Sequence, residues 1–285
     1  MVWPANKVRA KLAQGQVVVG SGAYSWSPAI MEAAGHAGLD FMRIDAEHSW
    51  RQDHTMEHLV LAARFAGVEP IIRVDRDDPY IIRKALEIGA GGIICPQIET
   101  PAEAKAVVRA AKFPPAGIRG YSSICHAGGW GKKTGNAYVE WSDREPLIGV
   151  MIETASAVEK VEAIMAVDGV DFVLFGPADL SMSYGLRRPD QNHPKVFGAL
   201  ERTIAAARSN GKHVMFDTGL DPAGQDRWAE MGVTMFEIDS DLGVCRRTWA
   251  ANADALAGRK IAMARKSAAK STAKSTKKPA RKMPT

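Results

Sequence analysis

The sequence predicts a closed (β/α)₈ barrel, and three observations support this fold class. Eight short runs of β-branched or apolar residues alternate with stretches of ten or more residues that have helical periodicity. Strict alternation of strand and helix implies parallel pairing with right-handed crossovers. A chain of 285 residues with 46% hydrophobic residues is long enough for one such barrel, which typically takes about 250 residues.

Each predicted strand is a continuous apolar run, as expected for strands that are buried on both faces of a parallel sheet. The runs are VVVGSG (17–22), FMRID (41–45), PIIRV (70–74), GGIICP (91–96), LIGVMIE (147–153), FVLFG (172–176), HVMFD (213–217) and MFEID (235–239).

The predicted helices lie between these runs, and several start at Ser, Thr or Asp and end at Gly, as helix caps require. They cover residues 27–38, 55–67, 78–89, 100–113, 156–167, 193–211, 221–232 and about 241–256.

Charge divides the chain into two parts. Residues 258–285 contain ten Lys or Arg and no acidic residue, which leaves 27 positive against 32 negative side chains in residues 1–257. We therefore expect an acidic barrel domain over 1–257 and a disordered Lys/Ala-rich basic tail over 258–285. The tail is either a solvated extension or a segment that contacts nucleic acid or another polyanion without sequence preference.

Composition excludes several classes of protein. No stretch approaches the roughly 18 consecutive apolar residues of a membrane helix, and the N-terminal sequence lacks the apolar core of a secretion signal. The three cysteines, Cys95, Cys125 and Cys245, have no CxxC spacing, which argues against a disulfide framework and a thiolate zinc site. We expect a cytoplasmic protein without membrane contact.

Chemistry-bearing residues concentrate where the predicted strands end. In a (β/α)₈ barrel these positions surround one opening, the mouth, where active sites of this fold are built. The residues are Asp45, Glu47, His48, Arg73, Pro96, Gln97, Glu153, Asp179, Asp217 and Asp239.

Glu153 and Asp179 end neighbouring strands, so that their carboxylates can converge on one oxygen-preferring cation. Two protein carboxylates with open positions suit a catalytic Mg²⁺ or Mn²⁺ better than a structural ion. The alternative is that each carboxylate caps a helix or forms a salt bridge.

Arg73 lies inside an apolar strand and needs an anion, because an unpaired buried guanidinium is very costly. That anion is either a structural Asp or the carboxylate and developing oxyanion of a substrate. His48 follows Asp45 by three residues, so that the carboxylate can hold the imidazole in one tautomer for proton transfer.

Residues 114–146 interrupt the alternation with a long segment rich in Gly, Trp and Lys. Segments of this length are uncommon in compact domains and often serve binding or closure. We expect either a mobile cover over the mouth or an ordinary surface loop.

The blocks IDAEHSW, IIRV, KFPPAGIRG, IET and GPADLS occur in this order and spacing across roughly residues 15–255. The sequence thereby resembles the HpcH/HpaI family of metal-dependent, class II pyruvate aldolases. The basic tail lies outside the resemblance.

The resemblance implies a phosphoenolpyruvate/pyruvate-type barrel with a swapped C-terminal helix, assembled as a homohexamer, a trimer of dimers. It implies that Mg²⁺, Mn²⁺ or Co²⁺ binds at Glu153 and Asp179 and that Arg73 lies beside the keto oxygen of the substrate. It assigns proton transfer to the His48–Asp45 dyad and places Glu87 near the site. The backbone of Gly176, Pro177 and Ala178 would receive the pyruvate carboxylate.

The activity that follows is reversible cleavage of a 4-hydroxy-2-oxo acid to an aldehyde and pyruvate, or a close analogue such as hydroxypyruvate. Two alternatives remain: a decarboxylase or other lyase acting on a metal-bound 2-oxo acid enolate such as that from oxaloacetate, and a protein that binds nucleic acid through its tail. One departure from the family is Met151, where many relatives have Gln.

Overall fold

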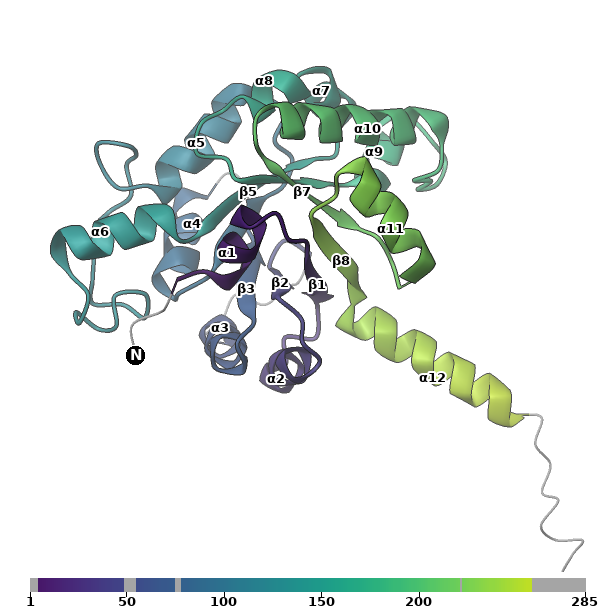
Figure 1. Cartoon of the computed structure of the whole chain (residues 1–285), viewed down its shortest axis with the longest axis horizontal. Coiled ribbons are helices and arrows are strands. Elements are labelled where there is room, and N and C mark those ends of the chain that lie inside the picture. Colours follow the sequence, from purple (N-terminus) through teal and green to yellow (C-terminus); the bar gives the residue numbers. More distant parts are fainter. Residues whose placement is uncertain (1–4, 49–54, 75–77, 221, 258–285) are drawn as a thin grey trace, which may run out of the picture. The chain divides into compact units, whose positions relative to one another are not determined.

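The computed structural model describes residues 5–48, 55–74, 78–220 and 222–257. Eight parallel strands pair in sequence order, and β1 also pairs with β8, so that the sheet closes into a barrel (Figure 1). The strands are β1 (Val18–Ala23), β2 (Phe41–Asp45), β3 (Glu69–Arg73), β4 (Gly92–Cys95), β5 (Leu147–Ile152), β6 (Phe172–Phe175), β7 (His213–Asp217) and β8 (Met235–Ser240). The predicted (β/α)₈ barrel is confirmed.

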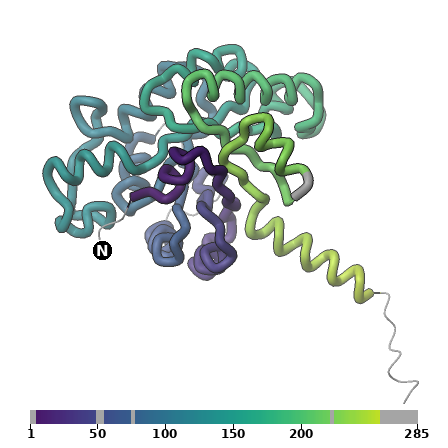
Figure 2. The backbone as a smooth tube through the Cα atoms, in the orientation of Figure 1, coloured from purple at the N-terminus to yellow at the C-terminus, as the bar shows by residue number. Residues whose placement is uncertain are grey.

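Helices lie outside the strands, and neighbouring ones such as α2 and α3 pack side by side (Figures 1 and 2). The helices of the barrel unit are α1 (Lys7–Ala13), α2 (Pro28–His36), α3 (Thr55–Ala66), α4 (Pro79–Glu87), α5 (Pro101–Ala111), α6 (Gly135–Arg144), α7 (Ala155–Glu159), α8 (Val161–Met165), α9 (Pro177–Ser183), α10 (Pro194–Ser209) and α11 (Pro222–Met231). The sequence reading missed α1, α6 and α9. It also merged α7 and α8, which are separated at Lys160.

Local sequence explains several helix starts. Asp78 accepts backbone N–H groups of Tyr80 and Ile81 at the start of α4. Thr100 and Glu103 form a capping box at the start of α5, with Pro101 in its first turn. Such caps satisfy N–H groups that have no partner within the helix, and they fix where each helix begins.

Two apolar cores lie on either side of the barrel wall. The larger one packs outward-facing strand residues against the helices. The smaller one fills the barrel interior with residues such as Phe41, Ile71 and Phe172, and it includes Val8 and Leu12 of α1. Helix α1 therefore closes the end of the barrel at which the strands begin, which leaves the mouth at the other end.

Residues 114–146 connect the end of α5 to the start of β5. Within the same chain they therefore lie at the end of the barrel where the strands begin. Tyr138 and Trp141 of this segment form an apolar cluster with Phe113, and the N–H of Ala127 donates to the carbonyl of Glu87 at 2.9 Å. The interpretation as a cover over the mouth of the same chain is wrong, because a segment that enters β5 must approach from the start of that strand.

The chain forms two compact units, residues 1–242 and residues 243–285. Helix α12 (Asp241–Ala257) is the last described element, and the predicted tail lies outside the described residues. The domain boundary at 257 and the swapped helix stay predictions.

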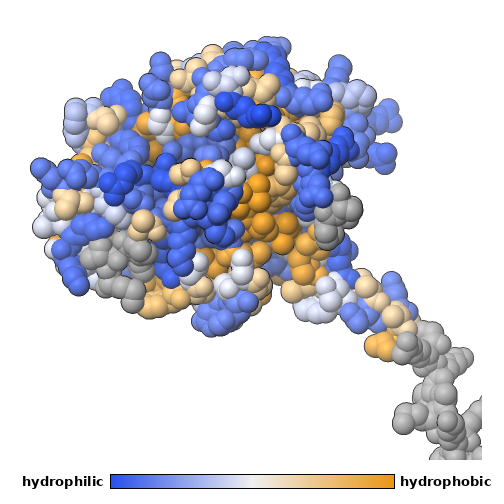
Figure 3. All heavy atoms as spheres, viewed as in Figure 1, coloured by the Kyte–Doolittle hydropathy of each residue, from blue (hydrophilic) through white to orange (hydrophobic). Residues whose placement is uncertain are grey.

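Among the described residues, no helix is long and apolar enough to cross a membrane. Hydrophilic residues cover most of the face seen in Figure 3, with hydrophobic ones gathered near its centre.

Candidate active site

Alternation along the strands determines which side chains enter the barrel. In β2, Phe41 belongs to the interior core, so that Arg43 and Asp45 also face inward at steps of two. In β5, the same alternation leads from Leu147 to Met151. Along β2 the inward-facing residues thus change from the apolar Phe41 at the strand start to the charged Arg43 and Asp45 towards the mouth.

Asp45 and Arg73 occupy matched positions in β2 and β3. Arg73 Nη2 donates to Asp45 Oδ2, and Arg43 Nη1 donates to the same oxygen at 3.0 Å. Burial alone would raise the pKa of this carboxyl, but the Arg73 guanidinium reverses the effect and lowers the pKa to about 2. The carboxylate is ionised and fixed. The anion considered for Arg73 was either a structural Asp or a substrate, and the structure shows an Asp, Asp45.

Arg43 was missed by the sequence reading. Its Nε and Nη2 donate to the two carboxylate oxygens of Glu237 in β8, both at 2.6 Å. Its side chain is only 7% exposed. The sequence contains the pattern that would have identified Arg43, because it is a charged residue in an apolar strand and faces inward, as Arg73 does.

The segment after β2 is held by Asp45 through backbone groups. Asp45 Oδ1 accepts the N–H groups of Glu47 at 3.1 Å and His48 at 3.0 Å. The expected contact between this carboxylate and the imidazole is therefore replaced by a contact with the His48 backbone. The exposed imidazole lies instead near Glu47, with Nε2 3.9 Å from Oε2.

Glu47 contacts the guanidinium of Arg73. Its Oε2 lies 3.0 Å from Arg73 Nη1. Met151 approaches the same guanidinium from β5, with its Sδ 3.9 Å from Nη1. Arg73 Nε has no hydrogen-bond partner within the described part of the chain.

A cavity of about 230 Å³ opens at this end of the barrel. Its lining residues come from four strand ends and are Glu47, His48, Gln97, Glu153, Thr154 and Asp179. Sequence reasoning placed five of the six at strand ends, and Thr154 follows Glu153 directly.

Glu153 is the buried carboxylate of this cavity, with 3% of its surface exposed. The backbone N–H of Gln97 donates to its Oε1 at 2.6 Å, and Gln97 adopts a left-handed φ of 54° to do so. Burial raises the pKa of Glu153 to about 7, and the carboxylates of Glu47 and Asp179 add to this effect. Three acidic groups thus share a small space.

The turn after β6 brings Asp179 to the cavity. Gly176 caps α9, and Asp179 lies in the first turn of that helix beside Pro177 and Ala178. A Cβ at Gly176 would lie 2.7 Å from Glu153 Cβ and 2.9 Å from Oε2. Glycine is therefore required for the backbone after β6 to approach Glu153.

The donor set fits a hard divalent cation. Two carboxylates line the cavity from adjacent strand ends and leave room for oxygen atoms of water or substrate. Within the described ranges, no group of three or more His, Cys, Asp or Glu side chains is arranged to hold a metal. The assignment of Glu153 and Asp179 as the metal ligands stays a prediction.

Glu87 is not brought to this cavity in its own chain. It ends α4, which returns from the mouth towards the start of β4. The backbone around Gly176, Pro177 and Ala178 does border the site. Asp217 ends β7 as expected, whereas β8 continues one residue past Asp239 to Ser240. The two carboxylates accept the N–H groups of Gly219 and Ser240, respectively.

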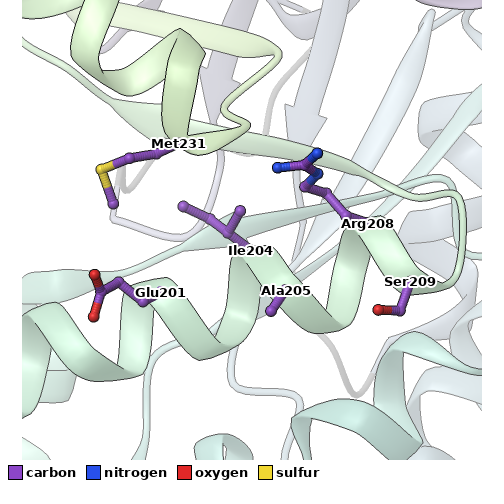
Figure 4. A pocket seen from close by; sticks show the side chains of 6 residues that line it. All are labelled: Glu201, Ile204, Ala205, Arg208, Ser209 and Met231. Atoms are coloured by element: carbon purple, nitrogen blue, oxygen red, sulfur yellow. The ribbon is translucent and has the colours of Figure 1, made fainter.

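A second hollow, of about 380 Å³, lies on the outer surface between α10 and α11 (Figure 4). Its lining residues are Glu201, Ile204, Ala205, Arg208, Ser209 and Met231. It does not border any strand end, and the acidic groups of the mouth are absent from its lining. The cavity at the mouth is thus the candidate active site.

Comparison with known proteins agrees with this geometry. Residues 23–248 match the HpcH/HpaI aldolase/citrate lyase family. The chain belongs to this family. The resemblance read from the sequence is thereby confirmed, and with it an aldolase-type carbon–carbon lyase of the metal-dependent class II.

Curated relatives cover nearly the whole barrel of this family member. A 5-keto-4-deoxy-D-glucarate aldolase of Klebsiella pneumoniae is 35% identical over 252 residues, 88% of this chain and 96% of that protein. A hydroxypyruvate/pyruvate aldolase of Cupriavidus necator is 34% identical and covers 84% of this chain and 88% of its own.

A solved HpcH/HpaI aldolase from Desulfitobacterium hafniense shares the fold, with a TM-score of 0.81 and 31% identity. The match covers 89% of this chain and 97% of that one.

Proposed function

We propose that this family member catalyses the reversible aldol cleavage of a 4-hydroxy-2-oxo acid to an aldehyde and pyruvate, or a close analogue such as hydroxypyruvate. The observation that carries the proposal is one small cavity at the mouth that combines Glu153 and Asp179 with the Arg73 guanidinium at its edge. The names of the two curated relatives support the same class of 2-oxo acid.

Glu153 and Asp179 would hold a divalent ion, Mg²⁺, Mn²⁺ or Co²⁺. When bound, such an ion supplies Lewis-acid polarisation of the substrate oxygens. The backbone N–H of Gln97 keeps Glu153 in one rotamer, because it donates to Oε1. Asp179 is placed by the first turn of α9, so that both ligands are set by the fold before substrate arrives.

Arg73 would stabilise the enolate oxygen that develops as the C3–C4 bond breaks. Its guanidinium is fixed by Asp45 and Glu47, and it therefore needs little reorganisation during the reaction. The positive charge of the Arg73 guanidinium would also suit an anionic substrate oxygen near Nη1. The backbone of Gly176, Pro177 and Ala178 would receive the substrate carboxylate at the opposite side of the cavity.

His48 would move the proton of the 4-hydroxyl group, directly or through a water. Cleavage takes that proton, forms the aldehyde C=O and leaves the electron pair of the C3–C4 bond in the pyruvate enolate, which then takes up a proton at C3. Asp45 positions His48 through its backbone N–H, and Glu47 lies beside the imidazole. No lysine is required for a Schiff base.

The direct test measures pyruvate release from a 4-hydroxy-2-oxo acid by the full chain. We expect chelator to abolish release and Mg²⁺ or Mn²⁺ to restore it. Titration with Mn²⁺ should show loss of binding for Glu153→Gln and Asp179→Asn but not for Asp217→Asn, an exposed carboxylate at another strand end. Activity that is indifferent to chelator, or Mn²⁺ binding that survives both substitutions, would contradict the proposal.

Oxaloacetate separates aldol cleavage from the alternative activity. A decarboxylase of this type would use the same ligands and Arg73, so that turnover of oxaloacetate is compared with that of the 4-hydroxy-2-oxo acid on one preparation. We expect the hydroxy-oxo acid to be the better substrate. A strong preference for oxaloacetate would assign the decarboxylase instead.

The family resemblance also supports a cytoplasmic homohexamer in which Glu87 reaches a neighbouring subunit's site. Light scattering checks the hexamer, and the activity of Glu87→Gln in the intact assembly checks the role of that residue. Nucleic-acid binding by residues 258–285 would appear as steeply salt-dependent binding that deletion of those residues removes.

A further inference from the structure

Tyr24 follows β1 directly and continues its inward-facing series. Val18 belongs to the interior core, and steps of two lead through Gly20 and Gly22 to Tyr24. In an eight-stranded barrel β1 lies opposite β5, since three strands lie between them in either direction. Tyr24 therefore enters the mouth from the side opposite Glu153.

The phenol of Tyr24 is held in place by Arg43. Arg43 Nη2 donates to the Tyr24 hydroxyl at 3.1 Å, and the guanidinium carbon lies 5.4 Å from the ring centroid. Gly22 lies beneath them, and a Cβ there would be 3.1 Å from both Arg43 Nη2 and Tyr24 Cε2. The missing side chain at Gly22 thus provides the space that these two groups occupy.

Arg43 is itself immobile. Glu237 binds two of its nitrogens and Asp45 binds a third, all within the buried interior. The Tyr24 backbone is fixed as well, because its N–H donates to Asp241 Oδ1 at 3.0 Å. An aromatic side chain anchored at both its backbone and its hydroxyl is a preorganised binding group.

The Tyr24 hydroxyl is available as a donor. Because its oxygen already accepts a hydrogen from Arg43, its own proton points to a different acceptor. Burial raises the pKa of Tyr24, so that the phenol stays protonated at neutral pH. Tyr24 is only partly buried.

We propose that Tyr24 is a specificity residue for the aldehyde half of the substrate and that it selects aldehydes with a hydroxyl or carboxylate oxygen next to the carbonyl carbon. This inference rests on the proposed aldolase function. Under that function the 2-oxo acid would occupy the side of Glu153, Asp179 and Gly176, and His48 follows β2, the neighbour of β1. A chain that extends from the 2-oxo acid past His48 therefore reaches Tyr24.

The positive charge of Arg43 beside Tyr24 also favours an aldehyde with an oxygen atom at this position. Arg43 polarises the hydroxyl because it donates to the phenol oxygen, and this strengthens the phenol as a donor towards an oxygen atom. An alkyl group at this position would leave the O–H without its acceptor, which costs binding energy. Tyr24 would thus discriminate by a hydrogen bond rather than by size.

The test compares two aldehydes that differ by one hydroxyl, glycolaldehyde and acetaldehyde, in metal-dependent condensation with pyruvate. We expect Tyr24→Phe to lower kcat/KM for glycolaldehyde by about three- to tenfold, the effect of one hydrogen bond, and to leave acetaldehyde within about twofold. Tyr184→Phe is the matched control, because Tyr184 packs against the outer core at the end of α9.

Exchange of the pyruvate C3 protons with D₂O separates this inference from the proposed function. Exchange needs no aldehyde, and we expect the same metal-dependent rate in the unmodified enzyme and Tyr24→Phe. An equal loss for both aldehydes, or no loss for either, would overturn the role of Tyr24 while exchange persists. Absence of exchange in the unmodified enzyme would refute the proposed function itself, and the role of Tyr24 with it.

Discussion

Asp45 and Arg73 are register partners in neighbouring parallel strands, and their side chains form an ion pair inside the barrel. Arg43 donates to the same carboxylate oxygen from below, and Glu47 contacts Arg73 from above. The ion pair thus connects the buried polar side chains at β1, β2 and β8 with the cavity that Glu153 lines. Substitutions along this network should therefore change stability and chemistry together.

Loss of the Asp45 carboxylate should destabilise the fold. Asp45→Asn leaves Arg43 and Arg73 short of an anion in a buried site, and we expect the free energy of unfolding to fall by about 3 kcal/mol. Urea denaturation at neutral pH measures this change. Asp168→Asn, at an exposed loop position, is the control and should stay within about 0.5 kcal/mol of the unmodified protein.

Lowering the pH should reduce the stability difference between the unmodified protein and Asp45→Asn. The pKa of Asp45 is about 2 in the folded protein, against a usual value of 3.8. The ionised group therefore contributes stability above about pH 4, and that contribution, about 2 kcal/mol, is lost as the pH falls towards 2. The stability gap between the unmodified protein and Asp45→Asn should narrow over this interval, and a gap that widened would contradict the ion pair.

Gly176→Ala should disturb the metal site specifically. The new Cβ would collide with the Glu153 side chain at 2.7 Å from its Cβ, so that the carboxylate must move. We expect Mn²⁺ affinity in calorimetric titration to fall by at least about tenfold, a change of about 1.4 kcal/mol. Gly198→Ala is the control, since nothing lies within 4 Å of a Cβ there and its helix should gain up to about 1 kcal/mol.

The buried pair of Arg43 and Glu237 should show strong coupling. Glu237→Met alone or Arg43→Met alone should cost about 3–5 kcal/mol, because each leaves a buried charge without its partner in this pair. The double variant Arg43→Met with Glu237→Met should recover most of that loss, since both charges are removed. Denaturation of the two single variants and the double variant measures the coupling, and additive losses would show that the pair is not coupled.

The sequence was sufficient to predict the barrel and most of the cavity lining. Apolar runs and helix caps locate strands and helices, and a closed parallel barrel then places residues such as Glu153, Asp179 and His48 around one mouth. This inference uses only local periodicity and the rule that strand ends meet.

Contacts between side chains were harder to predict. The distance of three residues between Asp45 and His48 permits a carboxylate–imidazole contact, but the carboxylate binds the backbone N–H instead. The interior pair of Arg43 and Glu237 joins residues 194 positions apart, and it depends on β1, β2 and β8 being adjacent. Pairing of this kind follows from barrel closure and not from any local pattern.

Gln97 provides a final test of how the fold sets the metal ligand. Its left-handed backbone, with φ of 54°, directs its N–H to Glu153, and such a conformation is strained for any residue with a side chain. Gln97→Gly should keep this N–H, retain Mn²⁺ affinity and raise the free energy of unfolding by up to about 1 kcal/mol. Gln97→Val, with a branched Cβ, should lower both stability and Mn²⁺ affinity. Chemical denaturation and Mn²⁺ titration of the two variants check these outcomes, and equal metal affinity in both would show that the Gln97 backbone does not position Glu153.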